Sequence, residues 1–464
     1  MFLSELTRRD LLKSFGLGVG AAALSAVNLA PQTARADFVS QKDKTSGTLL
    51  DGSQATPVKM QADGSIVRPQ LLLPTICETD VLVVGGGPAG CCAAIAAARL
   101  GVKTTLVERY GHFGGLCTGG LVVHILGHWT LEGKEKVQAT QGIGEEMMKR
   151  LEGLPNGIVN REFGRNPTLD AEAYKYLLVE MITEANIEVF LHSWAIDAIV
   201  DDKVDSTTGN PIVRGAVIQT KLGPQAILAK QVIDTTGDGD VFAPSGAAHT
   251  QRMYNIGLPY RIGNLDRAKP QNGEKPPRHL GDVTPVPGVR WVNMTGPSLD
   301  GVDVKTLSKL ELQHRKQIWK QVQEVRNTPG YEDVYLMETA PQIGVRITRV
   351  IEGEETLKLE DAKSGKKFED CVGIGGAWHG DHIGWQIPYR SLVPKNVENI
   401  ITAGRSLSAE PLMSDVVRVI PNCWVSGHAA GVAAALAVKS GVLARNVSIP
   451  NVQKTLLEQK AYLG

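Results

Sequence analysis

Three glycines directly follow a short apolar run in the segment VLVVGGGPAGCCAA, Val81 to Ala94. They have the spacing Gly-x-Gly-x-x-Gly, at Gly85, Gly87 and Gly90, and each position has a physical reason. The first allows a tight turn, the second lets the backbone approach a pyrophosphate, and the third lets the next helix pack close to the sheet. The N-terminus of that helix then faces the phosphates. The alternative interpretation is a structural glycine turn without a ligand.

Glu108 lies 18 residues after Gly90, at the end of a second apolar run, Thr104–Val107. A carboxylate at this point can accept a hydrogen bond from a ribose 2′-hydroxyl, and it disfavours a 2′-phosphate. The pattern therefore predicts a site for FAD or NAD rather than NADP. The sequence has one such glycine unit, so we expect an external electron acceptor or donor rather than a nicotinamide bound at a second site.

Two histidines flank a carboxylate in the glycine-rich segment GGAWHGDHIGW, which contains His379, Asp381 and His382. Removing a hydride from a carbon that bears a hydroxyl or amine needs a base for the heteroatom proton. The ordinary pKa of histidine suits that task. The segment is therefore a candidate catalytic site. A metal pair and an ordinary polar loop are the alternatives, and because no further ligands cluster nearby we predict no metal site.

Three arginines and two further histidines are also candidates. Arg346, Arg390 and Arg418 could bind a substrate carboxylate, bind a cofactor phosphate or pair with acids of the core. We take Arg346 as the arginine that orients the substrate. His124 and His128, in VVHILGHW, could line the same pocket or serve as structural hydrogen-bonding groups.

The six cysteines are scattered through the chain without CxxC, CxxCH or finger-like spacing. This argues against an iron–sulfur cluster, a c-type haem or a zinc site. Cys91 and Cys92 are consecutive on a predicted helix, so their side chains point about 100° apart. We expect both to fill a helix–sheet contact. Cys117 is expected to pack or to line the site, which disfavours a thiol–disulfide reductase.

Hydrophobic periodicity predicts the elements that position these groups. Val81–Val84, a small-residue helix over Cys91–Leu100 and Thr104–Val107 form a βαβ unit. Further helices are predicted at Leu169–Ala185, Val304–Arg326 and Cys423–Lys439. Further strands are predicted at Ile187–Phe190, Ile196–Val200, Ile212–Thr220, Gln225–Ile233 and Ile400–Ala403. Asp37–Glu78 is predicted to be an extended arm, and Tyr254–Gly301 to be irregular.

Three segments resemble the flavoproteins that have two dinucleotide domains. Phe113–Gly120 resembles their loop that runs toward the isoalloxazine ring. Val232–Asp240 resembles the strand that brings the chain back to the nucleotide, and Ile400–Gly431 resembles the strand and helix that close on the flavin. Many of these proteins have Gly-Asp where this chain has Gly404-Arg405.

With Gly404-Arg405 in place of Gly-Asp, the chain resembles a bacterial group usually called FAD-dependent oxidoreductases. The segments PQIGVRITR, Pro341 to Arg349, and IPYRSLVP, Ile387 to Pro394, also resemble motifs of this group. The resemblance covers most of Thr79–Ser440 and implies FAD as the cofactor. It implies an α/β fold, with a Rossmann-like, glutathione-reductase-like FAD-binding domain and an inserted mixed α+β substrate domain.

The resemblance also implies the residues that bind the cofactor. Besides the three glycines and Glu108, they are Pro88, Ala89, Arg109, Gly114, Gly115, Leu116, Ala195, Thr236, Gly237, Asp238, Gly404, Arg405, Ala429 and Ala430. The corresponding division of the chain is 1–36 export signal, 37–78 arm, 79–125 FAD segment 1, 126–168 substrate or cap segment, 169–250 FAD segment 2, 251–395 substrate or cap domain, and 396–464 FAD segment 3.

The N-terminal residues predict export. Thr7–Lys13, with Arg8-Arg9, precedes an uncharged run over Ser14–Ala30, and Ala34-Arg35-Ala36 offers small residues for cleavage. This resembles a twin-arginine signal, which implies the twin-arginine export machinery as a partner and a periplasmic or secreted location. The alternative, a membrane helix, is disfavoured because the run is short and rich in small residues, so no stable membrane insertion is expected. Acidic and basic residues balance, which predicts no nucleic-acid partner.

Together these observations predict an exported FAD-dependent dehydrogenase that acts on a small polar substrate. Hydride would pass between the substrate and flavin N5, with His379 or His382 as base. Two other functions remain open at this point. One is a periplasmic alkene reductase, similar to fumarate reductases, that uses an external donor. The other is a flavin-dependent isomerase or hydratase with no net redox change.

Overall fold

The glycine segment lies at the end of a central strand in a seven-stranded sheet. The computed structural model describes residues 58–68, 71–132, 135–162, 165–270, 275–376 and 384–464. The strands follow the order β10-β11-β12-β3-β4-β9, and β24 also pairs with β12. They are β3 (Thr75–Val84), β4 (Thr104–Val107), β9 (Glu188–Phe190), β10 (Trp194–Val204), β11 (Pro211–Thr220), β12 (Gly223–Asp234) and β24 (Ile400–Thr402).

Strand β3 is parallel to both of its neighbours, β4 and β12. Its last residues alternate between two cores, as the period of a strand requires. Val81 and Val83 pack in one hydrophobic core, and Leu82 and Val84 pack in the other with Phe242. A strand buried on both faces needs a continuous apolar run, as Val81–Val84 is. Because β3 and β4 are parallel and α2 connects them, the predicted βαβ unit is confirmed.

Strand β12 changes partner along its length. Gly223–Leu228 pairs with β11 in an antiparallel ladder, and Val232–Asp234 pairs with β24 in a parallel one. The carboxyl ends of β3, β4, β12 and β24 therefore meet at the same edge of the sheet. Loops that leave these four ends can build one site.

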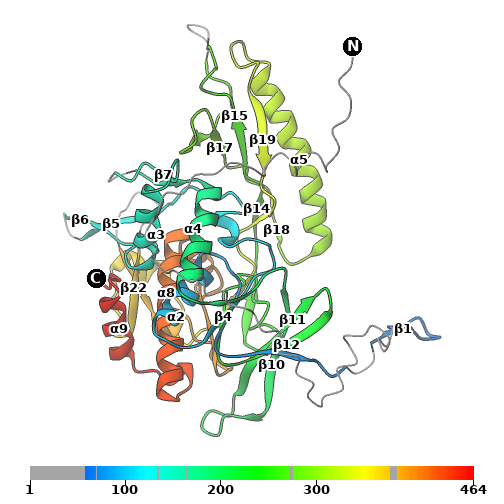
Figure 1. Ribbon diagram of the computed structural model, residues 1–464, viewed down its shortest axis with the longest axis vertical. Helices are drawn as coiled ribbons and strands as arrows, with labels where there is room; N and C mark the ends of the chain where they lie inside the picture. The colour runs from blue at the N-terminus through cyan, green and yellow to red at the C-terminus, as the bar shows by residue number, and fades with distance from the viewer. Residues whose placement is uncertain (1–57, 69–70, 133–134, 163–164, 271–274, 377–383) are drawn as a thin grey trace, which may run out of the picture. The chain divides into compact units, whose positions relative to one another are not determined.

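Helices α2 (Pro88–Arg99) and α8 (Ile420–Ser440) lie against each other and against the sheet (Figure 1). A Cβ at Gly427 would stand 2.1 Å from the carbonyl oxygen of Ala89, and one at Gly431 would stand 2.2 Å from that of Ala93. The two helices thus touch through their backbones. Helices α3 (Ile143–Glu152), α4 (Ala171–Glu184) and α9 (Ile449–Glu458) pack beside them.

In the described ranges, no single helix is both long and apolar enough to span a membrane. Helix α7 (Pro411–Val417) and α8 meet that test of length and composition together, and they are bent by 86° where they join.

Smaller sheets and one long helix form a second region of the chain. Helix α5 (Val304–Arg326) has the predicted bounds and lies beside β19 (Figure 1). Asp303 caps it, because its carboxylate accepts hydrogen bonds from the backbone N–H groups of Lys305 and Thr306. The strands of this region are β14 (Met253–Gly257), β15 (Tyr260–Gly263), β16 (Asp282–Val283), β17 (Arg290–Val292), β18 (Ser298–Asp300), β19 (Tyr335–Thr339) and β20 (Gly344–Val345).

Two expectations about secondary structure are wrong. The segment Tyr254–Gly301, expected to be irregular, contributes strands β14 to β18. These strands have two to five residues each, which is too short to show a period between the many prolines and glycines. The predicted arm ends too late, because β3 begins at Thr75 and its first residues pair with β12.

The remaining described elements are short. They are β1 (Lys59–Met60), β2 (Ile66–Val67), β5 (Trp129–Glu132), β6 (Glu135–Gln138), β7 (Ile158–Val159), β8 (Thr168–Leu169), β13 (His249–Gln251), β21 (Arg349–Ile351), α6 (Leu359–Ser364), β22 (Cys371–Gly375), β23 (Trp385–Pro388), and the 3₁₀ turns η1 (Gly115–Cys117), η2 (Tyr389–Ser391) and η3 (Ala444–Asn446).

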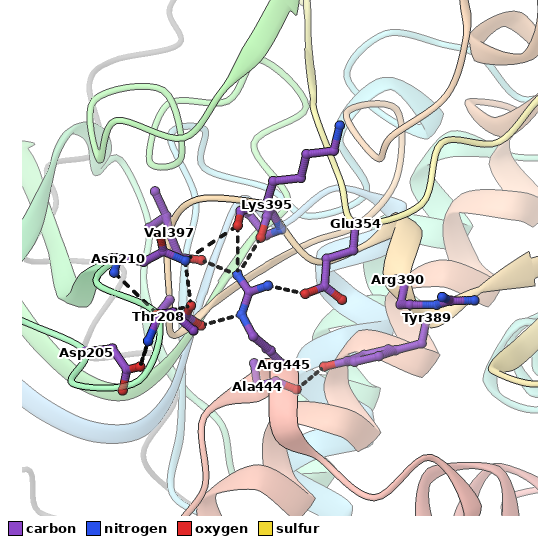
Figure 2. A network of polar contacts seen from close by, with 12 residues as sticks. Asp205, Thr208, Asn210, Glu354, Tyr389, Arg390, Lys395, Val397, Ala444 and Arg445 are labelled. Atoms are coloured by element: carbon purple, nitrogen blue, oxygen red, sulfur yellow. Dashed lines mark hydrogen bonds and ion pairs between the residues drawn. The ribbon is translucent and has the colours of Figure 1, made fainter.

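A partly buried arginine, Arg445, joins distant parts of the chain to the residues that lead into β24 (Figure 2). Arg445 donates from Nε to Glu398 at 2.7 Å and also pairs with Glu354. The fully buried Glu398 carboxylate accepts two more hydrogen bonds, from Thr208 Oγ1 at 3.0 Å and Asn210 Nδ2 at 2.8 Å. This network fastens the loop between β10 and β11 and the C-terminal segment to the residues that lead into β24.

Candidate active site

A cavity opens at the edge of the sheet where β3, β4, β12 and β24 end. Including its open mouth, it contains about 810 Å³ of empty space. We call it the glycine-loop cavity. Most of its wall is formed by residues that follow the four strands: Gly85, Gly87, Pro88, Ala89, Glu108, Arg109, Tyr110, Thr235, Thr236, Gly237, Ala403, Gly404 and Arg405.

The three glycines of the loop meet different surroundings, as their spacing predicts. Gly85 has a φ of +103°, and a Cβ there would stand 2.6 Å from the carbonyl oxygen of Thr235. A Cβ at Gly90 would stand 1.7 Å from the carbonyl oxygen of Gly85. At Gly87, however, a Cβ would meet no atom within 4 Å, because it would point into open space. Two glycines thus serve close packing, and the third leaves the backbone bare toward the cavity.

Glu108 holds the glycine loop while it lines the cavity. Its Oε2 accepts a hydrogen bond from the backbone N–H of Gly86 at 2.7 Å, and its Oε1 accepts one from Tyr110 at 2.8 Å. Burial raises the pKa of this carboxyl, while the backbone donors and Arg109 act in the opposite direction. Each carboxylate oxygen keeps a further lone pair, so Glu108 can also accept a ligand hydroxyl.

Two arginines of the cavity wall share one carboxylate that lies behind them. Arg405 donates to Asp238 at 2.6 Å, and Arg109 lies 3.7 Å from the other oxygen of Asp238. Although burial opposes ionisation, these two guanidiniums hold the pKa of Asp238 below its ordinary value. Burial and the Asp238 charge raise the pKa of Asp240, also in the wall, to about 7. The wall therefore suits an anionic ligand.

Most of the residues predicted to bind the cofactor line this cavity, including Gly115, Leu116 and Ala195. Five do not: Gly90, Gly114, Asp238, Ala429 and Ala430. Gly90 packs against the loop, and Gly114 donates its N–H to the carbonyl oxygen of Gly86 at 2.7 Å. Asp238 acts through Arg405 and Arg109, whereas Ala429 and Ala430 are fully buried in the middle of α8. Helix α8 meets the cavity only in its first turn, through Ile420 and Cys423.

Gln342 lines the cavity, although it is not among the residues predicted from the sequence. Its side chain is 8% exposed, and its Oε1 has no hydrogen-bond partner among the described residues. A buried carbonyl without a partner is unfavourable, so a ligand donor would satisfy it. Its position in the motif Pro341–Arg349 was the only available signal.

A second cavity adjoins the first. Including its open mouth, it contains about 1380 Å³ of empty space. Leu116, Arg405, Arg418 and Ile420 line both cavities. We call the second one the arginine cavity. Its other walls come from segments far apart in the sequence, among them Val122, His124, Tyr254, Asn255, Asp282, Trp291, Asn293, Arg346 and Asp415.

The three candidate arginines are in different environments. Arg346 lines the arginine cavity and donates to the carbonyl oxygen of Asn255 at 3.0 Å. Arg418 lines both cavities and pairs with Asp415, its Nε lying 2.9 Å from Oδ1. Arg390 instead pairs with Asp370, and it lines neither cavity. Two of the three arginines are therefore placed where a substrate could reach them.

The histidines divide in a similar way. His379 and His382, with Asp381, lie outside the described residues. His124 lines the arginine cavity, whereas His128 lines neither cavity and lies near Arg161. Burial, followed by the Arg161 charge, lowers the pKa of His128 to about 4, so it is a neutral structural group at neutral pH.

The cysteines are buried, as expected for packing residues. Cys91 and Cys92 have no exposed surface and lie in the core beneath α2. Cys91 Sγ donates to the carbonyl oxygen of Gly86 at 3.1 Å. Burial raises the pKa of Cys91 and of Cys117, which keeps both as thiols. The prediction that Cys91 and Cys92 are packing residues is confirmed.

Comparison with known proteins gives one family match over most of the chain. The model of the family described as FAD dependent oxidoreductase matches residues 80–257 and 260–456. A digeranylgeranylglycerophospholipid reductase 2 from Methanopyrus kandleri is 35% identical over 127 residues, which cover 27% of this chain and 31% of that protein. A digeranylgeranylglycerophospholipid reductase from Thermoplasma acidophilum is 27% identical over 48% of this chain and 56% of that protein.

The chain thus spans less than two thirds of the length of each of these two relatives. Among solved structures, a geranylgeranyl bacteriochlorophyll reductase-like protein from Thermoplasma acidophilum is 16% identical. That comparison has a TM-score of 0.43 and covers 83% of this chain and 84% of the other.

Proposed function

Because the chain belongs to the FAD-dependent oxidoreductase family and is an enzyme with FAD as its cofactor, we propose that it is an exported dehydrogenase. It moves a hydride between a small polar substrate and flavin N5, and the electrons pass to an external acceptor. The observation that carries this proposal is the wall shared by the two cavities, at Leu116, Arg405, Arg418 and Ile420. A substrate in the arginine cavity would lie next to a ligand in the glycine-loop cavity.

The residues of the glycine-loop cavity fit FAD. The open space at Gly87 would admit the pyrophosphate at the N-terminus of α2, and Glu108 would accept a ribose hydroxyl. Arg109 and Arg405 supply positive charge. The side-chain carbonyl of Gln342 would accept a hydrogen bond from a donor group of the flavin. In finer detail we propose a glutathione-reductase-like arrangement of the FAD-binding segments.

The chain itself would bind the substrate, hold its polar group and take its proton. When bound, FAD supplies the two-electron acceptor for the hydride. Arg346 would orient the polar group of the substrate. His379 or His382, with Asp381 beside them in the sequence, would take the proton that leaves the substrate hydroxyl or amine. The apolar side chains of Leu116 and Ile420 would limit water between the two cavities.

Export by the twin-arginine route is part of the proposal, and its support is the sequence pattern around Arg8-Arg9. That route carries folded proteins, which suits an enzyme that must collect FAD first. A variant with Lys at both positions should remain inside the cell as a flavin-containing protein, while the unchanged chain should be found outside the inner membrane. Equal distribution of the two proteins would contradict this part of the proposal.

The opposite direction, reduction of a substrate by an external donor, is the second candidate. Both of the relatives named above are reductases by name. Turnover with a reduced dye, and none with an oxidising dye, would favour that direction. An isomerase or hydratase would instead turn over without consuming either dye.

The main test is anaerobic mixing of the purified holoprotein with sugars, hydroxy acids and amines. We expect loss of the flavin absorbance with one class, and expect that loss to slow at least about a hundredfold in a His379→Ala, His382→Ala variant. His192→Ala is a suitable control because this exposed histidine lines neither cavity. Unchanged bleaching in the double variant would refute the assigned base.

A further inference from the structure

Arg346 carries a charge that the described residues leave uncompensated. Its guanidinium donates to the carbonyl oxygen of Asn255 at 3.0 Å and to Asn293 Oδ1 at 3.4 Å. Both acceptors are neutral, and within the described ranges no Asp or Glu oxygen lies within 4 Å of it. A partly buried cation without a counter-ion is costly, and an arriving anion would offset that cost. Arg346 lines the arginine cavity, so a ligand there can be that anion.

The neighbours of Arg346 add to this positive field. Burial and the nearby Arg418 charge lower the pKa of Arg346 from its ordinary value, while Tyr254 and Asp415 act in the opposite direction. Asp415 is engaged with Arg418, whose guanidinium lies 5.6 Å from the centre of the Tyr254 ring. Burial and Asp415 raise the pKa of Tyr254, so its hydroxyl stays protonated. Asp415 is thus engaged with Arg418, and Arg346 has no carboxylate at ion-pair distance among the described residues.

A flat aromatic wall stands in the same cavity. The rings of His124 and Trp291 are stacked, with 5.8 Å between their centres and 12° between their planes. Thr168 Oγ1 lies 3.0 Å from His124 Nδ1 and fixes the ring. Burial lowers the pKa of His124, although Asp282 at the cavity wall opposes the shift, so the ring is neutral at neutral pH.

The indole of Trp291 has an unused donor. The residue is 4% exposed, and its Nε1 has no hydrogen-bond partner among the described residues. Together, a stacked aromatic pair and a guanidinium without an ion-pair partner among the described residues favour a ligand that is flat and carries a negative charge.

We propose that the substrate is a monocarboxylate with a flat, unsaturated or aromatic body. Its carboxylate binds Arg346 through a two-pronged hydrogen bond, and its body lies along His124 and Trp291. This inference rests on the proposed function, because the arginine cavity is taken there as the substrate site. The other end of the substrate then lies toward Leu116 and Ile420, where the cavity joins the one for the cofactor.

The test uses benzoate as the probe and calorimetry with the oxidised holoprotein as the readout, so it does not depend on turnover. Benzamide has the same shape without the charge, and cyclohexanecarboxylate has the charge without the flat ring. We expect benzoate to bind more tightly than both. Arg346→Gln should weaken benzoate binding roughly tenfold to a hundredfold, the range expected for the loss of a charged hydrogen bond. Arg346→Lys should recover part of this loss.

Arg390→Gln is the matched control, because Arg390 pairs with Asp370 and lines neither cavity. It should bind benzoate as the unchanged protein does. A change in the flavin spectrum on addition of benzoate should accompany binding, since the two cavities adjoin. Equal affinity for benzoate and benzamide, or full affinity in Arg346→Gln, would overturn the inference. Flavin bleaching by an uncharged substrate alone would also overturn it, yet would leave the proposed dehydrogenase intact.

Discussion

Replacing Gly87 by alanine should separate cofactor binding from folding. Gly87 has a φ of −72° and a ψ of −173°, an extended conformation that any residue can adopt. An added Cβ would meet no protein atom within 4 Å, so the apoprotein should keep its stability to within about 1 kcal/mol. The same methyl group would stand in the space proposed for the pyrophosphate. Crowding of that kind costs roughly 1–3 kcal/mol, so the Kd for FAD should rise about 5-fold to 150-fold.

Gly90→Ala is the contrasting variant in the same loop. Its Cβ would stand 1.7 Å from the carbonyl oxygen of Gly85 and 2.6 Å from Thr235 Oγ1. The backbone atom cannot move aside without opening the contact between loop and helix. We therefore expect the apoprotein to lose about 3 kcal/mol or more of unfolding free energy.

The assay has two independent readouts for each variant. Thermal unfolding of the apoprotein, followed by circular dichroism, measures the fold. Titration of the apoprotein with FAD, followed by quenching of flavin fluorescence, gives the Kd. The reasoning fails if Gly87→Ala binds FAD as tightly as the unchanged protein, or if it lowers the Tm of the apoprotein as much as Gly90→Ala does.

Two further predictions concern stability. Arg445→Met leaves the buried Glu398 carboxylate without its cation, so unfolding by urea should show a loss of about 3–5 kcal/mol, which Glu398→Gln in the same chain should largely restore. Burial lowers the folded-state pKa of His428 to about 4, although its hydrogen bond with Gln459 opposes the shift. Stability from this neutral histidine is present above the unfolded pKa of about 6.5 and is lost as the pH falls from there toward 4, by up to about 3 kcal/mol. His428→Gln should therefore lose less Tm between pH 7 and pH 5 than the unchanged protein.

Each of these two predictions has a clear contrary result. A second substitution at Glu398 that adds to the loss, rather than reversing it, would show that Arg445 acts by packing alone. A parallel fall of Tm with pH in the His428 variant and the unchanged protein would show that His428 is not among the groups that take up protons on unfolding.

The parts of the protein that the sequence predicts well are those whose reasons are local. The glycine spacing follows from the geometry of one turn, and each of Gly85, Gly87 and Gly90 meets the surroundings it predicts. The helix over Val304–Arg326 follows from its amphipathic period and the cap at Asp303. Local reasons also account for Cys91 and Cys92. They lie on α2, a helix of small residues that is buried on most of its surface, so both side chains pack against neighbouring elements.

The arginine cavity could not be predicted, because its walls come from distant segments. Tyr254, Trp291, Arg346 and Arg418 are brought together only by short strands and long connections. The sequence drew attention to both arginines without showing that they share a cavity. Ala429 and Ala430 were predicted to bind the cofactor, but neither lines the glycine-loop cavity. A helix at this cavity was predicted, and the first turn of α8 reaches the cavity, whereas Ala429 and Ala430 lie in the core.

The backbone contact between α2 and α8 has a consequence for ligand length. Both helices begin at the wall of the glycine-loop cavity, one at Pro88 and the other at Ile420. Since Gly427 and Gly431 press directly on the backbone of α2, no side-chain adjustment can change the separation of these two beginnings. The contact therefore fixes the distance between the N-termini of the two helices. A ligand that contacts both N-termini must have a length that matches this fixed separation.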